Sequence, residues 1–192
     1  MEPLVETLMT RFPQAVLSVE ADTARSEVTV QVAAERLLEL ARFLHDAPEA
    51  SFDHLTDICS VDYPEDRQRF EVVYHLHSLS HHRRLRLKAR LSEDDPTIES
   101  VTPVWKGAEF LEREVYDMMG IRFWGHPDLR RILMWEGYPY FPLRKDFPLA
   151  GRPSEMPDVA FTGVAPLEGG PFVTCADGQD TIGREPRARV VQ

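Results

Sequence analysis

The sequence predicts an α+β fold in which helices pack on one face of a mainly antiparallel sheet. Three observations support this prediction. A helix, two strands, a second helix and a run of strands follow one another along the first half of the chain, an order typical of α+β domains. The segment 81–91 alternates leucine or alanine with arginine or lysine, as a half-buried antiparallel strand does. The segment 34–47 repeats its leucines at helical spacing.

The first elements follow from short-range patterns. Apolar residues at helical spacing predict a first helix, which ends at Pro13 because proline cannot continue a helix. The runs 15–22 and 27–33 are rich in β-branched residues and flank a short polar turn, so they predict a hairpin. The leucine stripe of 34–47 then predicts a second helix.

A run of strands is expected next, at 52–64, 70–78 and 81–91. The segment 98–105 is either another short strand or the approach to a helix. A third helix is predicted over 107–119, where apolar residues again recur at helical spacing. Its end is expected at Gly120, since glycine readily takes the left-handed cap conformation.

The chain divides into an α+β domain over 1–134 and an extended arm over 135–192. Proline and glycine recur through the arm and no helical or strand period persists, so the arm cannot bury enough apolar surface to fold alone. It nevertheless carries six phenylalanine and tyrosine residues: Tyr138, Tyr140, Phe141, Phe147, Phe161 and Phe172. We therefore expect the arm to wrap a partner subunit.

Composition excludes several functions. The chain has 22 basic and 32 acidic residues, and a net charge of −10 is unsuited to binding nucleic acid or anionic lipid. Its two cysteines, Cys59 and Cys175, cannot alone supply the four thiolates of an iron–sulfur cluster. No signal peptide or membrane-spanning run is apparent, so a soluble chain is expected and any attachment to a membrane would come through another chain.

Two surface clusters have open interpretations. Four histidines lie near the expected turn between the strands 70–78 and 81–91: His75, His77, His81 and His82. A metal could bind two of them, but no carboxylate or cysteine stands at ligand spacing, so solvated histidines are the favoured interpretation. The basic residues of the strand 81–91 form a ladder that could bind an acidic partner. The ladder could equally be a solvated strand face, or it could keep an edge strand from pairing with another chain: Arg84, Arg86, Lys88 and Arg90.

The segment 112–134 concentrates charge. On the predicted helix, Arg113 is four residues from both Glu109 and Asp117, which predicts ion pairs along one face. His126 stands between a glycine and a proline, which favours a structural role over proton transfer. Asp128 is expected to cap a short helix over 129–134. Further cations follow, with Asp146 as their expected acidic partner: Arg130, Arg131, Arg144 and Lys145.

This segment resembles the signature of the thirty-kilodalton subunit family of respiratory complex I, the C subunits of bacterial NADH:quinone oxidoreductases. The matching positions are Glu112, Arg113, Glu114, Asp117, His126, Arg130, Ile132 and Leu133, and the block 142–149 with Arg144, Lys145 and Asp146 is similar to the second conserved block. The resemblance implies a scaffold subunit of the peripheral arm, with these charged residues at subunit interfaces and with no catalytic, cofactor-binding or metal-binding residues of its own.

The same resemblance implies the neighbours. The chain would pack on the forty-nine-kilodalton (D) subunit near the quinone site, beside the cluster-bearing B and I subunits, at the cytoplasmic face of the inner membrane. FMN and iron–sulfur clusters would lie in partner subunits. One alternative is the equivalent subunit of a membrane-bound hydrogenase or of a chloroplast-type dehydrogenase-like complex. Another is a stand-alone enzyme that uses four residues of the signature: Glu112, Glu114, Asp117 and His126.

Overall fold

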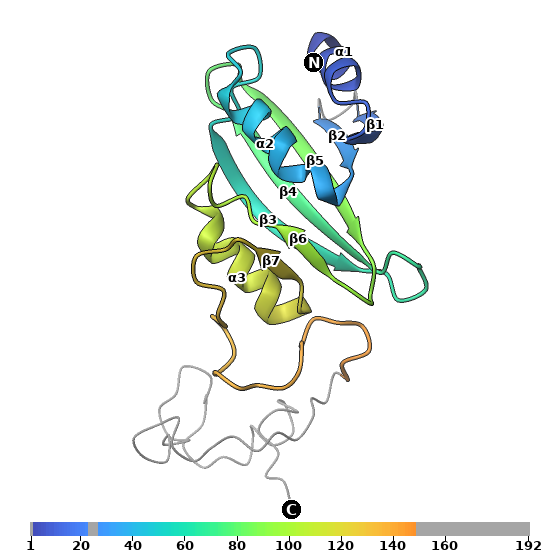
Figure 1. The fold of residues 1–192 in the computed structure, drawn as a ribbon, viewed down its shortest axis with the longest axis vertical. Helices are drawn as coiled ribbons and strands as arrows, with labels where there is room; N and C mark the ends of the chain where they lie inside the picture. The colour runs from blue at the N-terminus through green and yellow to red at the C-terminus, as the bar shows by residue number, and fades with distance from the viewer. Residues whose placement is uncertain (1, 23–26, 149–192) are drawn as a thin grey trace, which may run out of the picture.

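The computed structural model describes residues 2–22 and 27–148, and these form the predicted α+β fold. Figure 1 shows the elements in their order along the chain, which is α1 (Glu2–Arg11), β1 (Val16–Asp22), β2 (Glu27–Val32), the 3₁₀ turn Ala34–Arg36, α2 (Leu37–Asp46), β3 (His54–Asp62), β4 (Phe70–Ser78), β5 (Arg83–Leu91), β6 (Thr97–Glu99), α3 (Ala108–Met119) and β7 (Arg122–Trp124). Residues 149–192, most of the expected arm, lie outside the described residues.

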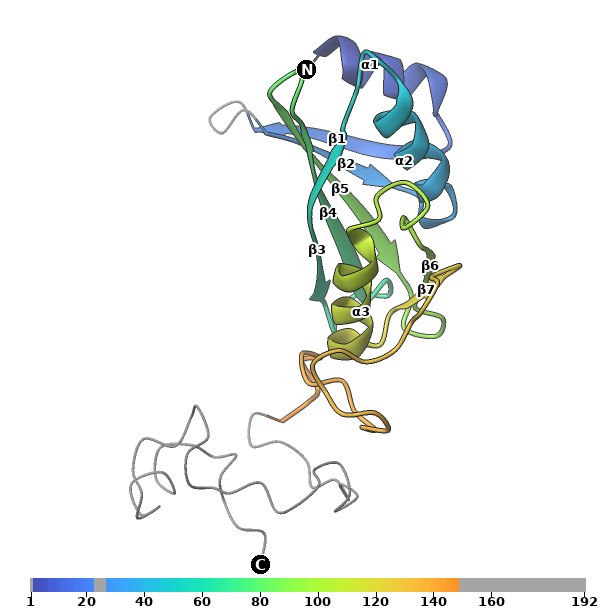
Figure 2. The same cartoon turned by 90° about the vertical axis from the view of Figure 1, so that its left-hand side faces the viewer.

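The main sheet has five strands in the order β1-β2-β5-β4-β3. All neighbours are antiparallel except β2 and β5, which run parallel, an arrangement that the long connection through α2, β3 and β4 makes possible. Figure 2 shows that α1, α2 and α3 lie on the same face of this sheet. The short strands β6 and β7 form a separate parallel pair beside α3.

Alternating side chains attach the helices to the sheet. The inward residues of β2 and β5 are buried, and the intervening residues face the open side of the sheet. Helix α2 adds the buried leucines Leu37, Leu40 and Leu44 to the same core. Each such side chain contributes roughly 1.5–3 kcal/mol when it is fully removed from water. The alternate residues of the strands and the leucines of α2 therefore pack into one shared core.

The basic ladder lies on a central strand, so the edge-guard interpretation is wrong. Strand β5 pairs with β2 on one side and with β4 on the other. Three of its cations find partners within the chain: Arg86 pairs with Glu27 at 2.9 Å, and Lys88 and Arg90 both pair with Glu71, at 3.1 and 2.9 Å. Most of the ladder is therefore neutralised internally.

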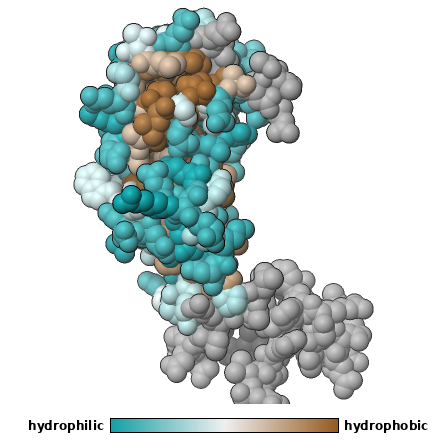
Figure 3. Space-filling model, turned by 90° about the vertical axis from the view of Figure 1, so that its right-hand side faces the viewer, coloured by the Kyte–Doolittle hydropathy of each residue, from teal (hydrophilic) through white to brown (hydrophobic). Residues whose placement is uncertain are grey.

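Apolar surface gathers at one end of the molecule. Figure 3 views the side that carries α1 and β1 and shows apolar side chains over its upper part and polar ones below. Met9 of α1 and Leu17 of β1 are 56% and 63% exposed. Within residues 2–22 and 27–148, no helix has the length and hydropathy needed to cross a bilayer.

Candidate docking site

Helix α3 buries three charged residues of the predicted signature. Glu112 and Asp117 are both 0% exposed and Arg113 is 8% exposed. Buried charges are costly unless each finds a hydrogen-bond or ion-pair partner. Glu112 finds its partners at residues 100–101, before the helix. Arg113 and Asp117 find theirs in the loop 130–134, which follows the helix and is built on it.

Asp117 binds the backbone of that loop. Its Oδ2 accepts the amide N–H groups of Ile132, Leu133 and Met134 at 3.0, 2.7 and 2.8 Å, and Oδ1 pairs with Arg131. Burial tends to raise the pKa of Asp117, but the Met134 amide, the Arg131 guanidinium and the other two amides outweigh it, so the pKa is lowered. The predicted helix over 129–134 is wrong, because the Asp117 carboxylate takes the amides of its second half, residues 132–134.

The predicted ion pairs of Arg113 are also wrong. Its guanidinium instead donates to the carbonyl oxygens of Arg130 and Arg131, with Nε at 3.1 Å and Nη2 at 2.9 Å. Asp117 takes the N–H side of the loop and Arg113 takes its carbonyl side. Arg113 and Asp117, which carry opposite charges on one helix, therefore fix the same loop through its carbonyl groups and its N–H groups.

His126 has a structural position, as predicted. Its Nδ1 accepts the amide N–H of Asp128 at 3.0 Å, and its Nε2 lies 3.0 Å from the carbonyl oxygen of Glu109. Asp128 does not cap a helix, since its carboxylate pairs with Arg130 at 2.8 Å on the surface. The turn after β7 is thus tied to the first turn of α3. Glu114, in contrast, faces solvent.

The start of the predicted arm returns to the domain. Arg144 Nε donates to the carbonyl oxygen of Met119 at 2.7 Å, and the Leu143 amide donates to that of Met118 at 3.1 Å. These bonds satisfy carbonyl groups that the end of α3 leaves without helical partners. Residues 142–148 therefore form part of the α3 site.

A buried ion pair that the sequence did not reveal holds the same segment. Arg69 binds Asp62 through two bonds of 2.7 and 2.9 Å. Asp62 Oδ2 also accepts the Lys145 amide at 2.7 Å, and Asp146 pairs with Arg69 at 3.3 Å rather than with its neighbouring cations. Asp62 ends β3 directly opposite Phe70 in β4. The sequence offered one indication of this ion pair, which is that Asp62 and Arg69 lie at the facing ends of two predicted strands.

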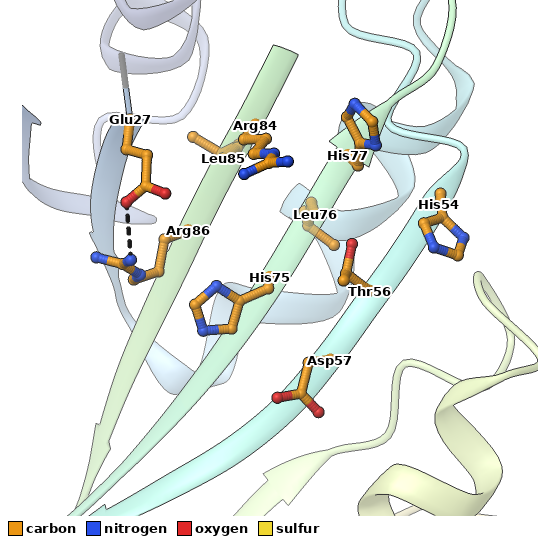
Figure 4. Close-up of a pocket in the computed structure, with 10 residues that line it drawn as sticks. All are labelled: Glu27, His54, Thr56, Asp57, His75, Leu76, His77, Arg84, Leu85 and Arg86. Atoms are coloured by element: carbon orange, nitrogen blue, oxygen red, sulfur yellow. Dashed lines mark hydrogen bonds and ion pairs between the residues drawn. The ribbon is translucent and has the colours of Figure 1, made fainter. Parts of the chain in front are cut away.

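Two of the four clustered histidines, His75 and His77, lie on the open face of the sheet, away from this site, and His81 and His82 lie on the turn between β4 and β5. A hollow of about 440 Å³ there is lined by His75 and His77 together with His54 and Asp57 from β3 (Figure 4). The register places His54 opposite His77 and Asp57 opposite His75, neighbours that spacing along the chain did not indicate. Among the described residues, no group of three or more histidine, cysteine, aspartate or glutamate side chains is placed to hold a metal ion.

The model of the family described as respiratory-chain NADH dehydrogenase, 30 kDa subunit, matches residues 30–153. The chain belongs to this family. The NADH-quinone oxidoreductase C subunit numbered 2 in Rhizobium etli is 46% identical over 161 residues, which cover 84% of each protein. The NADH-quinone oxidoreductase C subunit of a Roseiflexus species is 44% identical over 162 residues, which cover 83% of this chain and 87% of the relative.

Two solved structures share the fold of this family member. A trypsin-resistant fragment of Nqo5 superposes with a TM-score of 0.55 at 35% identity, covering 67% of this chain and 98% of the fragment. A chain of the membrane-bound sulfane sulfur reductase, an archaeal respiratory membrane complex, superposes with a TM-score of 0.65 and covers 77% of this chain and 85% of that one. At 23% identity the second likeness shows the fold alone.

Large apolar side chains surround α3 in this family member. Among them, Phe110, Leu133 and Leu143 are exposed by 57 to 60%, and Trp124 by 70%. They come from α3 itself, from the loop held by Asp117, from the returning segment 142–148 and from β7. Exposed apolar residues of this size, supported by a rigid polar network, are typical of a protein interface.

Gly120 should not tolerate a side chain. Its φ is +76°, and a Cβ atom would lie 2.6 Å from Arg144 and 2.7 Å from Phe141. We expect Gly120→Ala to lower the free energy of unfolding by about 1–3 kcal/mol, because it adds left-handed strain and displaces the returning segment. Gly107→Ala is the matched control, since Gly107 has a φ of −61° and open space around it. Equal denaturation midpoints for the two variants would contradict the prediction.

Proposed function

We propose that this chain is a scaffold subunit of the peripheral arm of a proton-translocating NADH:quinone oxidoreductase. It docks on the forty-nine-kilodalton (D) subunit near the quinone site, beside the cluster-bearing B and I subunits, and holds them in position for electron transfer. The observation that carries the proposal is the α3 site: its buried Arg113 and Asp117 fix the loop 130–134, and that loop presents Leu133 to the surface at 60% exposure. The family of the chain supports the same function.

The geometry favours this function over a stand-alone enzyme. Asp117 is saturated by three amides and a guanidinium, and His126 bonds to two backbone groups. Glu114 faces solvent, away from buried Glu112. A general acid–base pair needs side chains that reach one reacting atom, and these four are occupied or dispersed. The contribution to electron transfer is therefore positional.

The proposal extends to cofactors and location. FMN and the iron–sulfur clusters reside in partner subunits, and the chain reaches the cytoplasmic face of the cell membrane only through the complex. Affinity purification of the tagged chain from native membranes, with mass spectrometry of the partners, tests both points. A flavin-binding NADH subunit among the partners is the expected result. A nickel–iron hydrogenase subunit in its place would favour the alternative complex, and flavin or iron bound to the purified single chain would overturn the cofactor proposal.

Leu133→Asp tests the docking surface without disturbing the core. Leu133 is 60% exposed and contributes only its amide to the Asp117 network, so the variant should fold normally. A buried interfacial leucine replaced by a charge costs several kcal/mol, and we expect recovery of the partner subunits to fall by about tenfold or more. Leu79→Asp is the control, since Leu79 is 54% exposed on the turn between β4 and β5. Unchanged recovery with Leu133→Asp would show that partners bind elsewhere.

A further inference from the structure

Glu112 is a buried carboxyl group that the docking site does not use. It is 0% exposed on α3, and its two oxygens accept hydrogen bonds of 2.7 Å each, from the Ser100 hydroxyl and from the Val101 amide. Both donors are neutral, and no arginine or lysine in the described part of the chain forms an ion pair with it. Burial raises the pKa of Glu112 to about 7 in spite of these two bonds.

Two other titratable groups face Glu112, and neither is placed to take a proton in its stead. His126, from the turn after β7, lies 4.0 Å away, but its Nδ1 accepts the Asp128 amide and its Nε2 faces the Glu109 carbonyl oxygen. A carbonyl oxygen can only accept, so both contacts are satisfied together when Nε2 carries the hydrogen. Tyr74, from β4, has a buried hydroxyl without a hydrogen-bond partner among the described residues, and burial and the Glu112 charge both raise its pKa.

The charged neighbours on α3 are already occupied. Arg113 donates to the carbonyl oxygens of Arg130 and Arg131, and Asp117 pairs with Arg131 and three amides. A proton added to this region therefore enters Glu112 without breaking a bond of the docking loop. A proton on Nδ1 of His126 would instead remove the bond to the Asp128 amide.

A pair of hydroxyl groups connects Glu112 to the surface. Ser100 Oγ lies 2.7 Å from the carboxylate and 2.7 Å from Thr102 Oγ1, and in the second contact either atom can be the donor. When Glu112 is ionised, Thr102 donates to Ser100 and Ser100 donates to the carboxylate. When Glu112 is protonated, both bonds reverse. The chain is satisfied in either state, and Thr102 is partly exposed to solvent.

We propose that Glu112, Ser100 and Thr102 form a proton-binding site, in which the buried carboxyl group holds one exchangeable proton and the two hydroxyls carry it to and from solvent. On release, the Glu112 proton passes to Ser100 Oγ, the Ser100 proton to Thr102 Oγ1, and the Thr102 proton to a solvent water. One proton leaves and one negative charge remains on Glu112. The hops leave Ser100 donating to the carboxylate and Thr102 donating to Ser100, so a proton can return from water by the same steps in reverse. The site belongs to the chain itself and does not depend on the docking proposal.

Glu112→Gln in the full chain tests the carboxyl group. The folded pKa lies above the ordinary value of 4.5, so the folded state binds more protons than the unfolded state between the two values. Stability should therefore fall as pH rises through this window and level off above it. The unfolding constant of the wild type, relative to Glu112→Gln, should rise by up to about tenfold per pH unit between about pH 5 and 7. Parallel stability curves for the two proteins would overturn the proposal.

Glu114→Gln is the matched control, since Glu114 is exposed on the same helix, and its curve should run parallel to that of the wild type. Carbon-13 NMR of the wild-type carboxyl groups provides a measurement that does not depend on any variant folding. The Glu112 carboxyl carbon should titrate near neutral pH. A Glu112 carboxyl that stays ionised throughout would overturn the proposal.

Thr102→Val tests the hydroxyl path, because valine keeps the shape and removes the outer hydroxyl. In the wild type, exchange through the path should give one averaged Glu112 carboxyl resonance near the midpoint. In Thr102→Val the protonated and ionised forms should give separate or broadened resonances. The control is Thr97→Val, since the Thr97 hydroxyl donates to the exposed Asp95 carboxylate, away from Glu112. An averaged resonance in Thr102→Val would overturn the path.

Discussion

Replacing Asp117 by asparagine is expected to release the loop 130–134 from α3. Asparagine has one acceptor oxygen where aspartate has two, so it cannot accept from both the loop amides and Arg131. Its NH₂ group would face the guanidinium of Arg131. Removing one partner of a buried charge network costs about 3–5 kcal/mol, because the other charge is left unpaired. The amide protection of Ile132, Leu133 and Met134 against hydrogen exchange should fall by a hundredfold or more, on the order of 3 kcal/mol of local stability.

Asp128→Asn is the control for this prediction. The Asp128 carboxylate pairs with Arg130 on the surface, where both side chains are at least half exposed. Exposed pairs contribute roughly 0–1 kcal/mol, so loop protection should stay within a few-fold of the wild type. Retained protection in Asp117→Asn would show that Arg113 alone holds the loop. The effect should also depend on pH: the folded pKa of Asp117 lies below 3.8, so its stabilisation is present above this value and is lost as pH falls through the folded pKa.

Features that depend on short stretches of chain could be predicted from the sequence. The strands β1 to β5 follow from alternation and from turn residues, and α3 with its cap at Gly120 follows from helical spacing and one glycine. Gly120 takes the left-handed conformation with a φ of +76°, as predicted. In these segments the local preference and the tertiary environment agree.

The remaining features depend on partners distant in sequence. Residues 129–134 have a helix-like pattern, but their amides bond to Asp117, which lies 15 to 17 residues before the amides it binds. Helical spacing brought Arg113 close to Asp117, but loop carbonyl oxygens compete for its guanidinium. The parallel pairing of β2 with β5 joins segments separated by two other strands. Spacing along the sequence cannot predict which of the competing partners a residue binds, because these partners come together only in the folded chain.

Arg69→Met is expected to be as damaging as Asp117→Asn, at a place that the sequence did not mark. The side chains of Arg69 and Asp62 are 6% and 0% exposed, so methionine would fill the volume of arginine but leave a buried carboxylate without its cation. We expect a loss of about 3–5 kcal/mol in the free energy of unfolding by denaturant. Arg36→Met is the control, since its pair with Glu39 is about half exposed and should contribute under about 1 kcal/mol.

The double variant Asp62→Asn with Arg69→Met separates charge from shape. If the unpaired carboxylate causes the loss, removing its charge should restore part of the stability even though a second residue has been changed. The pH dependence gives the same answer by another route. Arg69 holds the pKa of Asp62 below its ordinary value of 3.8, so the pair stabilises the wild type above that value and its contribution is lost as pH falls through the folded pKa. In Arg69→Met burial without a cation should raise the pKa, so protonation would relieve the buried charge and the two proteins should converge in stability at low pH. A deficit that is independent of pH, with no recovery in the double variant, would assign the loss to packing rather than to charge.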